Sequence, residues 1–149
     1  MNFKQRIQAH YLQQVQDKID VFRDMITALT EDSKNDAKSS AGDKHETALS
    51  MMHIEQEKLS TKLNEVLLQK SVLDKLDVTK PHNTIALGSL VKTNGFYLFI
   101  SLALPKISLE NQTIIALSPQ SPLGQKLMGN QVGFSFDING TSFLVESIT

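Results

Sequence analysis

The sequence contains no cysteine and no tryptophan, and it has only two tyrosines and four prolines among 149 residues. Without cysteine the chain can form no disulfide, no zinc–thiolate site and no thiol nucleophile, and this absence fits a reducing compartment. No stretch approaches the roughly 20 apolar residues that a membrane-spanning helix needs. The amino terminus runs into polar glutamines, unlike a secretory signal peptide. We therefore expect a cytoplasmic protein with no membrane partner.

An excess of charge of either sign is also absent, because the net charge is only −1. Such a chain has no global basic field that would hold nucleic acid non-specifically. If the protein acts near RNA, a partner has to bring it there. With 40% hydrophobic residues the chain is expected to fold, and its length suits one large domain or two small ones.

Proline and glycine are nearly missing from the first half of the chain. All four prolines and six of the seven glycines follow Lys80, and only Gly42 precedes it. This change in composition predicts a boundary within residues 77–83 and two domains, residues 1–78 and residues 79–149.

Apolar residues of the first domain recur at alternating spacings of three and four, which is typical of a coiled-coil seam. The first seam contains Leu12, Val15, Ile19, Phe22, Ile26 and Leu29, and the second contains Leu49, Met52, Leu59, Leu63, Val66 and Leu73, interrupted by Gln56 and Lys70. Folding at about residue 39 aligns the seams so that Ile26 meets Met52. We expect an antiparallel α-helical coiled-coil hairpin with its tip near residues 39–46. Narrow seams and polar outer faces favour this hairpin over two helices of a globular bundle.

The second domain has the pattern of short strands separated by turns. Asn94-Gly95 and Asn139-Gly140 are dipeptides that type I′ hairpin turns prefer, because both central residues need positive φ. The predicted strands are Ile85–Lys92, Phe96–Ala103, Thr113–Leu117, Phe134–Ile138 and Ser142–Ile148.

A short helix is predicted after the third of these strands. Ser121 and Pro122 are typical of an N-cap and a first helical residue, and Gly129 stops the helix after Met128. We therefore expect an antiparallel sheet of four or five strands with one short helix, and an α+β fold for the whole chain.

Two groups of side chains could bind ligands but have simpler interpretations. Phe96, Tyr97 and Phe99 follow a turn, and we interpret them as sheet core rather than as a platform on which RNA bases stack. The histidines show no metal-ligand spacing, and we interpret them as surface residues: His10, His45, His53 and His82.

The predicted bend of the hairpin carries two carboxylates, Asp43 and Glu46, at positions i and i+3. On the first turn of a helix these side chains share one face. They could each give an oxygen to Mg²⁺, which prefers few protein ligands together with water and phosphate oxygens. The same spacing also forms a capping box, in which Asp43 is the N-cap and Glu46 bonds back to its backbone N–H. Spacing alone favours the capping box.

Two segments of the chain match one family pattern. The tip reads Gly42-Asp43-Lys44-His45-Glu46, and the short helix with its flanks runs from Ser121 to Phe134. They resemble the patterns G-D-L-x-E-N-x-E-Y and S-P-(I/L)-(A/G)-x-A-L-x-G-K-x-V-G-D of Gre-type transcript-cleavage factors. The resemblance spans both halves of the chain in the same order.

This resemblance implies a coiled coil followed by an FKBP-like domain, in a bacterial elongation factor that binds RNA polymerase. In that family the carboxy-terminal domain docks at the rim of the secondary channel, and the coiled coil inserts through it. Asp43 and Glu46 match the acids that help to hold Mg²⁺ at the polymerase active centre, where backtracked RNA is cleaved. The residues that would bind the partner are Ser121, Pro122, Leu123, Gly129, Val132 and Gly133.

By the same resemblance, the chain would have no cofactor of its own and would not be an enzyme. It would stimulate the nuclease activity of the polymerase and share its Mg²⁺. It would act on the nascent RNA 3′ end indirectly, and DNA within the elongation complex is a further expected neighbour.

Departures from the family pattern motivate alternatives. Lys44, Thr47 and Ser50 stand where the family has Leu, Asn and Tyr, and Phe134 replaces the usual acid. The alternative hypothesis is a regulator that occupies the secondary channel without promoting cleavage. A stand-alone prolyl isomerase is a third hypothesis, which the FKBP-like resemblance alone suggests. Such sites are lined by aromatic rings, whereas residues 79–149 contain no Trp and one Tyr.

Overall fold

The computed structural model describes residues 1–39 and 43–149, except for the side chains of residues 33, 35–39 and 43–45. It has two long helices, a six-stranded sheet and a short helix. Two compact units divide the chain: Leu12–Ser71 forms one, and Met1–Tyr11 together with Val72–Thr149 forms the other. We call them the hairpin unit and the sheet unit. The predicted domains follow composition along the chain whereas these units follow contacts, and the division at residue 78 stays a prediction.

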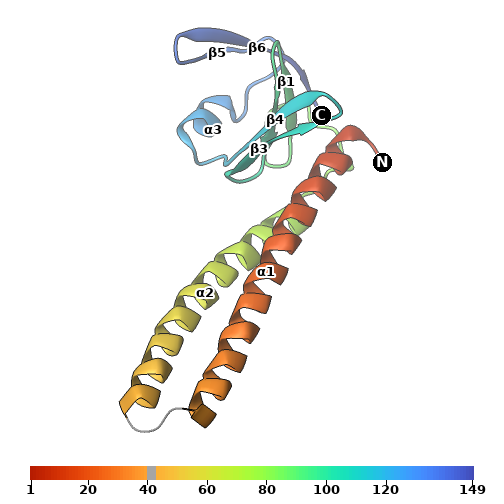
Figure 1. Cartoon of the computed structure of the whole chain (residues 1–149). Coiled ribbons are helices and arrows are strands. Elements are labelled where there is room, and N and C mark those ends of the chain that lie inside the picture. The colour runs from red at the N-terminus through yellow and green to blue at the C-terminus, as the bar shows by residue number, and fades with distance from the viewer. Residues whose placement is uncertain (40–42) are drawn as a thin grey trace. The chain divides into compact units, whose positions relative to one another are not determined.

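The two long helices are α1 (Phe3–Ser39) and α2 (Asp43–Lys75), which run antiparallel within the hairpin unit (Figure 1). Neither contains glycine or proline, so nothing in their sequences interrupts the helical hydrogen bonds. With 37 and 33 residues they are about 55 and 50 Å long at 1.5 Å per residue. Among the described residues, no helix has the length and apolar character needed to cross a membrane.

Burial follows the two predicted seams. Every seam position from Leu12 to Leu29 and from Leu49 to Lys70 is buried or half-buried. Apolar residues that lie off the seams are exposed, such as Val21, Met25 and Ile54. The seam positions therefore form the contact between the helices, and the predicted α-helical hairpin is confirmed.

The predicted register of the hairpin is wrong. Pairing Ile26 with Met52 would put residue 48 opposite Thr30, whereas the side chain of Gln56 donates a hydrogen bond to Thr30 Oγ1 at 3.2 Å. The first helix ends at Ser39 and the second begins at Asp43, so the reversal lies after Ser39. Each residue by which the reversal moves along the chain moves every facing partner by two, and the hydrogen bond between Gln56 and Thr30 requires such a shift.

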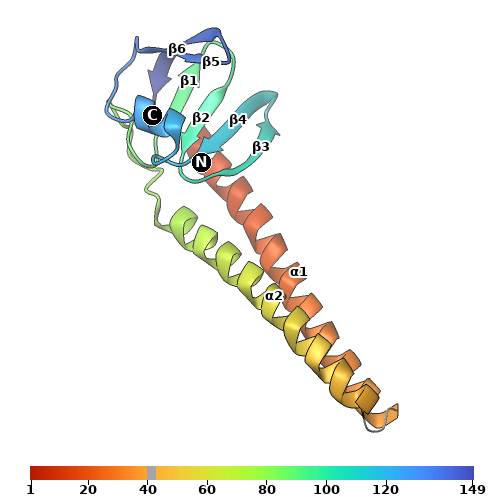
Figure 2. The same cartoon turned by 90° about the vertical axis from the view of Figure 1, so that its left-hand side faces the viewer.

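The sheet has the strand order β3-β4-β2-β1-β6-β5 (Figure 2). The strands are β1 (Leu90–Thr93), β2 (Tyr97–Ile100), β3 (Leu104–Leu109), β4 (Gln112–Leu117), β5 (Ser135–Ile138) and β6 (Thr141–Ile148). All neighbouring pairs are antiparallel except β2 and β4, which are parallel with Tyr97 opposite Ile114. The α+β fold is thus confirmed, but the sheet is mixed rather than wholly antiparallel.

The sequence prediction missed strand β3, and this omission explains the wrong sheet type. Pro105 lies near the start of β3, and proline is tolerated on an edge strand such as β3. Since β3 returns the chain to the other end of the sheet, β4 enters beside β2 in the same direction.

Only one of the two predicted type I′ turns has that backbone. Asn139 and Gly140 have φ of 51° and 83°, as expected, between β5 and β6. Asn94 and Gly95 do not lie in the left-handed region. Their turn is stabilised by Thr93, whose Oγ1 accepts from the Phe96 N–H at 3.2 Å and donates to the Phe96 carbonyl at 2.7 Å. Hydrogen bonds of the Thr93 side chain therefore stabilise this turn, in place of the positive-φ backbone that was expected.

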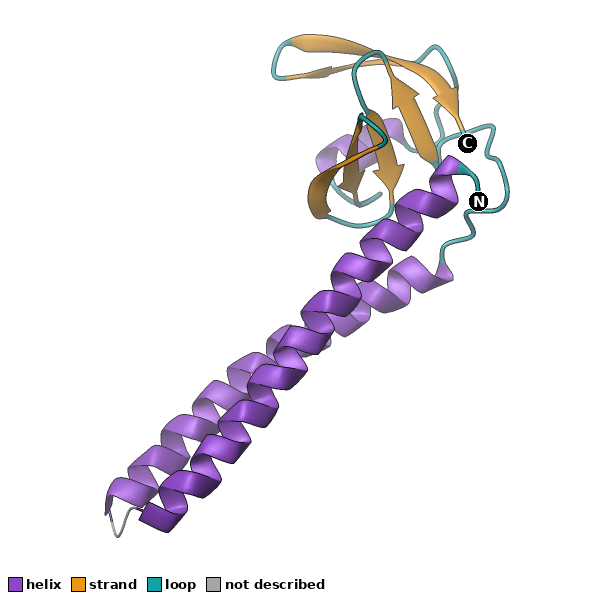
Figure 3. Cartoon of the chain, turned by 45° about the vertical axis from the view of Figure 1, so that its right-hand side comes forward, coloured by secondary structure: helices purple, strands orange, loops and turns teal. Residues whose placement is uncertain are grey.

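The short helix α3 (Pro122–Leu127) confirms its prediction and lies beside the strands (Figure 3). Ser121 is the N-cap, and its Oγ accepts a hydrogen bond from the Gly124 N–H at 3.0 Å. Gly124 is required by space, because a Cβ there would stand 2.1 Å from the Ser118 carbonyl oxygen.

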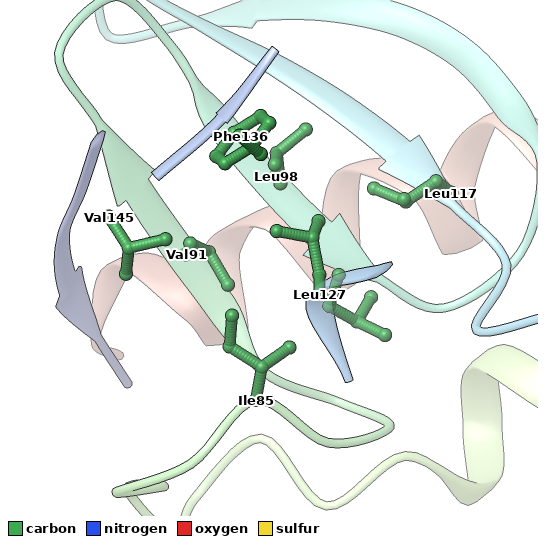
Figure 4. Close-up of a cluster of buried hydrophobic side chains, with 8 residues drawn as sticks. Ile85, Val91, Leu98, Leu117, Leu127, Phe136 and Val145 are labelled. Carbon is green, nitrogen blue, oxygen red and sulfur yellow. The ribbon is translucent and has the colours of Figure 1, made fainter. Parts of the chain in front are cut away.

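The sheet packs on both faces. On one face, buried side chains from five strands, α3 and the segment before β1 form the main core (Figure 4): Ile85, Val91, Leu98, Ile100, Leu117, Leu127, Phe136 and Val145. Phe99 alternates to the other face and is fully buried there, stacked on Tyr11 at 6.3 Å between ring centroids. The first turns of α1 therefore cover the second face. The interpretation as sheet core is confirmed for Phe99 and for Phe96, which packs against the main core, whereas Tyr97 is half-buried.

Candidate functional site

The predicted acidic tip lies at the start of α2. Asp43 is the first residue of this helix and Glu46 follows three residues later, so both belong to the first turn and share a face. The Glu46 side chain is exposed. The side chain of Asp43 lies outside the described residues, and the choice between capping and metal ligation therefore stays open.

The last described side chains of α1 are of mixed charge. On the last described turns of α1, Glu31, Asp32 and Lys34 are exposed. The described side chains at this end of the hairpin therefore include both acidic and basic groups. Thr47 and Ser50, which stand where the family pattern has Asn and Tyr, are also exposed. These small polar side chains occupy the positions that would meet any surface that the tip approaches.

The donor type at the tip fits Mg²⁺, because an exposed carboxylate offers the hard oxygen ligand that this ion prefers. Among the described side chains, no group of three or more His, Asp or Glu residues is placed to hold a metal ion. Any metal bound through Glu46 would therefore take its other ligands from outside the described side chains.

The six predicted partner-binding residues have different roles in the sheet unit. Ser121 caps α3, and Leu123 packs against the main core. Gly129 has φ of 80° and donates its N–H to the Ile85 carbonyl at 2.8 Å. The first part of the matched segment therefore has a structural role, because its contacts hold α3 against the segment before β1.

The remaining members of this set are placed differently. Gly133 has φ of 97° and donates its N–H to the Val145 carbonyl at 2.9 Å. Pro122 is exposed, and Val132 is 59% exposed although it is apolar. These two side chains are the members of the set most available to a partner, and a partner-binding role for the set stays a prediction.

A cluster of charged groups in the sheet unit was not predicted. Lys4 is only 4% exposed, and its ammonium donates a hydrogen bond to the Lys80 carbonyl at 3.1 Å. Burial lowers the pKa of Lys4, and the nearby Asp77 carboxylate partly opposes this effect. Hydrogen bonds from the side chain and backbone of Thr79 lower the pKa of Asp77. A lysine in an otherwise polar amino terminus gives no sequence signal of burial.

His10 and His82 are half-buried rather than exposed surface residues, and the side chain of His45 lies outside the described residues. The unpredicted contact is that of His82. Its ring is half-buried, and Nδ1 is hydrogen-bonded to the hydroxyl of the fully buried Ser89. Burial is the main cause that lowers the pKa of His82, and the positive charge of Lys4 adds to it. His53, in contrast, is exposed on α2.

No protein-family model and no curated protein matches the chain. Among solved structures, that of the transcription factor Gfh1 is similar, with 20% sequence identity and a TM-score of 0.34. The alignment covers 92% of this chain and 92% of that chain. A likeness at this level carries no argument about function, so the functional case depends on the residues described above.

Proposed function

We propose that this chain is a Gre-type elongation factor that binds RNA polymerase through its secondary channel and stimulates cleavage of backtracked RNA. The observation that carries the proposal is the position of Asp43 and Glu46 in the first turn of α2, at the end of an uninterrupted two-helix hairpin. The tip and residues 121–134 also resemble the Gre-type patterns, in which acids at this position help to hold Mg²⁺. The protein is then an accessory factor rather than an enzyme.

The hairpin suits delivery of a ligand to a recessed site. From Leu12 to Ser39 it has 28 residues, about 42 Å of helix, which a narrow channel can admit because the two helices pack along a single seam. Outside the seam its faces are mostly polar and remain hydrated during insertion. The sheet unit would stay at the rim, where the exposed Pro122 and Val132 contact the polymerase.

At the polymerase active centre, Asp43 and Glu46 would each present a carboxylate oxygen. These oxygens would help to hold Mg²⁺, which would supply an activated water for attack on the RNA phosphodiester. The contribution of the chain is to place two negative oxygen donors in one helical turn, at a spacing that the α-helix sets. Two such donors bind weakly alone, so activity is expected only in complex with the polymerase.

RNA cleavage in backtracked elongation complexes of the cognate polymerase tests the proposal. Wild-type protein should shorten the transcript, and Asp43→Ala or Glu46→Ala should reduce the rate by about 100-fold while binding persists. Glu57→Ala is the matched control, since Glu57 is an exposed glutamate on the same helix away from the tip. Equal rates for all four proteins would overturn the role of the tip acids.

A regulator that blocks the channel without promoting cleavage is the second candidate. The exposed Thr47 and Ser50 favour it, because the family pattern has an amide and an aromatic ring there. In that case the wild-type protein would compete with other channel-binding factors while the RNA stays full length. A chain with no affinity for polymerase would exclude both candidates.

A further inference from the structure

A cavity of about 300 Å³ lies within the sheet unit, between the start of α1, the segment after α2 and strands β1, β2 and β6. We call it the Lys4 cavity. Its volume is at the lower end of the range for small-molecule sites, which begins at about 300 Å³. Neither the tip acids nor the segment 121–134 lines it. Its ligand is therefore a separate question from polymerase binding.

The wall of the Lys4 cavity is largely apolar. The rings of Phe3 and Tyr97 meet edge to face, with centroids 5.2 Å apart and an interplanar angle of 69°. Val78 and Leu90 add aliphatic surface, and each is only 4% exposed. Such a wall gains free energy by covering the flat or branched hydrocarbon part of a ligand.

Lys4 is the buried charged residue among those that line this cavity, and the exposed residues Lys80 and Thr149 also line it. The Lys4 ammonium has three N–H donors, and the Lys80 carbonyl accepts one of them at 3.1 Å. No carboxylate of the described side chains lies within ion-pair distance of it. Burial lowers the pKa of Lys4, and the attraction of the Asp77 carboxylate opposes this effect. Lys4 is therefore a buried cation that lines the cavity, and its ammonium has N–H donors in addition to the one that the Lys80 carbonyl accepts.

The helix start beside the cavity adds to the positive potential. Asn2 and Gln5 cap α1 reciprocally, because each side chain accepts the other's backbone N–H at 2.8 Å. The first turn of α1 contains no acidic residue to balance the positive end of the helix dipole. An anion in the cavity would meet both this partial charge and the Lys4 ammonium.

We propose that the Lys4 cavity binds a small carboxylate that has an apolar, preferably aromatic, body. The carboxylate accepts hydrogen bonds from Lys4 Nζ, and the body packs between the Phe3–Tyr97 pair and the side chains of Val78 and Leu90. The carboxylate supplies a counter-charge within hydrogen-bond distance of Lys4, where no described side-chain carboxylate lies, while the ring covers the apolar wall. A small inorganic anion satisfies only the first of these requirements.

Benzoate is the probe, and benzamide is its neutral counterpart of nearly the same shape. Binding to the free full-length chain is measured by the change of backbone amide NMR shifts, without polymerase, so the result is independent of RNA cleavage. Benzoate should bind at least about tenfold more tightly than benzamide or inorganic phosphate. The amides that shift should belong to residues 2–4, 78–81, 90 and 97.

Lys4→Met and Lys4→Gln should each weaken benzoate binding at least about tenfold. Lys106→Met is the matched control, because Lys106 is exposed on β3 and does not line the cavity. If either Lys4 variant fails to fold, the comparison of benzoate with benzamide on the wild-type chain still decides. Absence of benzoate binding, equal binding of benzamide, or unchanged binding by the folded Lys4 variants would each overturn the proposal.

Discussion

The hairpin unit and the sheet unit bury their side chains to very different degrees. In the hairpin unit only three seam residues, Val15, Ile19 and Val66, are less than 9% exposed, and the rest of the seam is half-buried. The sheet unit has two packed faces and buries even Lys4 and Tyr11. A two-helix rod has no second layer, so it keeps most of its surface for contact with other molecules, whereas the sheet unit depends on contacts between distant segments.

The largest expected effect comes from removing one phenylalanine ring from each unit. Phe99→Ala in the sheet unit should lower the free energy of unfolding by about 3–5 kcal/mol, because it leaves a cavity under Tyr11. Phe22→Ala in the half-buried seam should cost only about 1–2 kcal/mol. Urea denaturation followed by circular dichroism measures both. Equal losses would contradict the contrast between the units.

A seam substitution tests the opposite direction. Gln56→Leu would complete the apolar seam of α2 and should raise the stability of the hairpin unit by about 1 kcal/mol. It removes the hydrogen bond to Thr30 Oγ1, but that hydroxyl still donates to the Ile26 carbonyl at 3.0 Å. Amide hydrogen exchange of residues 12–71 reports the change. A loss of protection there would show that the polar pair, rather than apolar packing, stabilises this part of the seam.

Tyr11 gives an alkaline test that concerns only the sheet unit. Burial raises its pKa to about 12, and its hydroxyl donates to the Pro105 carbonyl at 3.0 Å. Above pH 10 the unfolded state ionises first and binds fewer protons than the folded state, so stability falls as pH rises towards 12.

Tyr11→Phe should cost about 1 kcal/mol at pH 7 through the lost hydrogen bond. The same variant should lose less stability than the wild type above pH 10. Unfolding by urea at a series of pH values compares the two proteins, and the difference between them cancels the titration of Lys4. Parallel curves would mean that Tyr11 ionises normally in the folded protein.

Sequence-based prediction succeeded for local features of both units and failed for features that depend on contacts between distant residues. The seams from Leu12 to Leu29 and from Leu49 to Lys70 were predictable, because helical periodicity is a local property. The register was not, since it depends on where the chain reverses. Ser121 as the cap of α3 was likewise local and was predicted.

What sequence could not give in the sheet unit is the set of long-range pairings. Strand β3 was not predicted, and without it the parallel pair of β2 and β4 was not predicted either. Lys4 lies beside Lys80 only because residues 76 positions apart meet in the fold. At the candidate site, the acids were visible as a pair at i and i+3, but the exposure of Glu46, Thr47 and Ser50 required the folded hairpin.

His82 supplies the smallest expected effect and the complementary acid test. Its pKa is lowered from 6.5, mainly by burial and further by Lys4. As pH falls below 6.5, the unfolded state takes up a proton before the folded state does, so the sheet unit loses stability until the folded-state pKa is passed. His82→Asn keeps a side chain that can bond the Ser89 hydroxyl, and it should flatten this dependence between pH 7 and 5. Thermal unfolding at each pH distinguishes the proteins, and identical slopes would place the origin of the acid sensitivity outside His82.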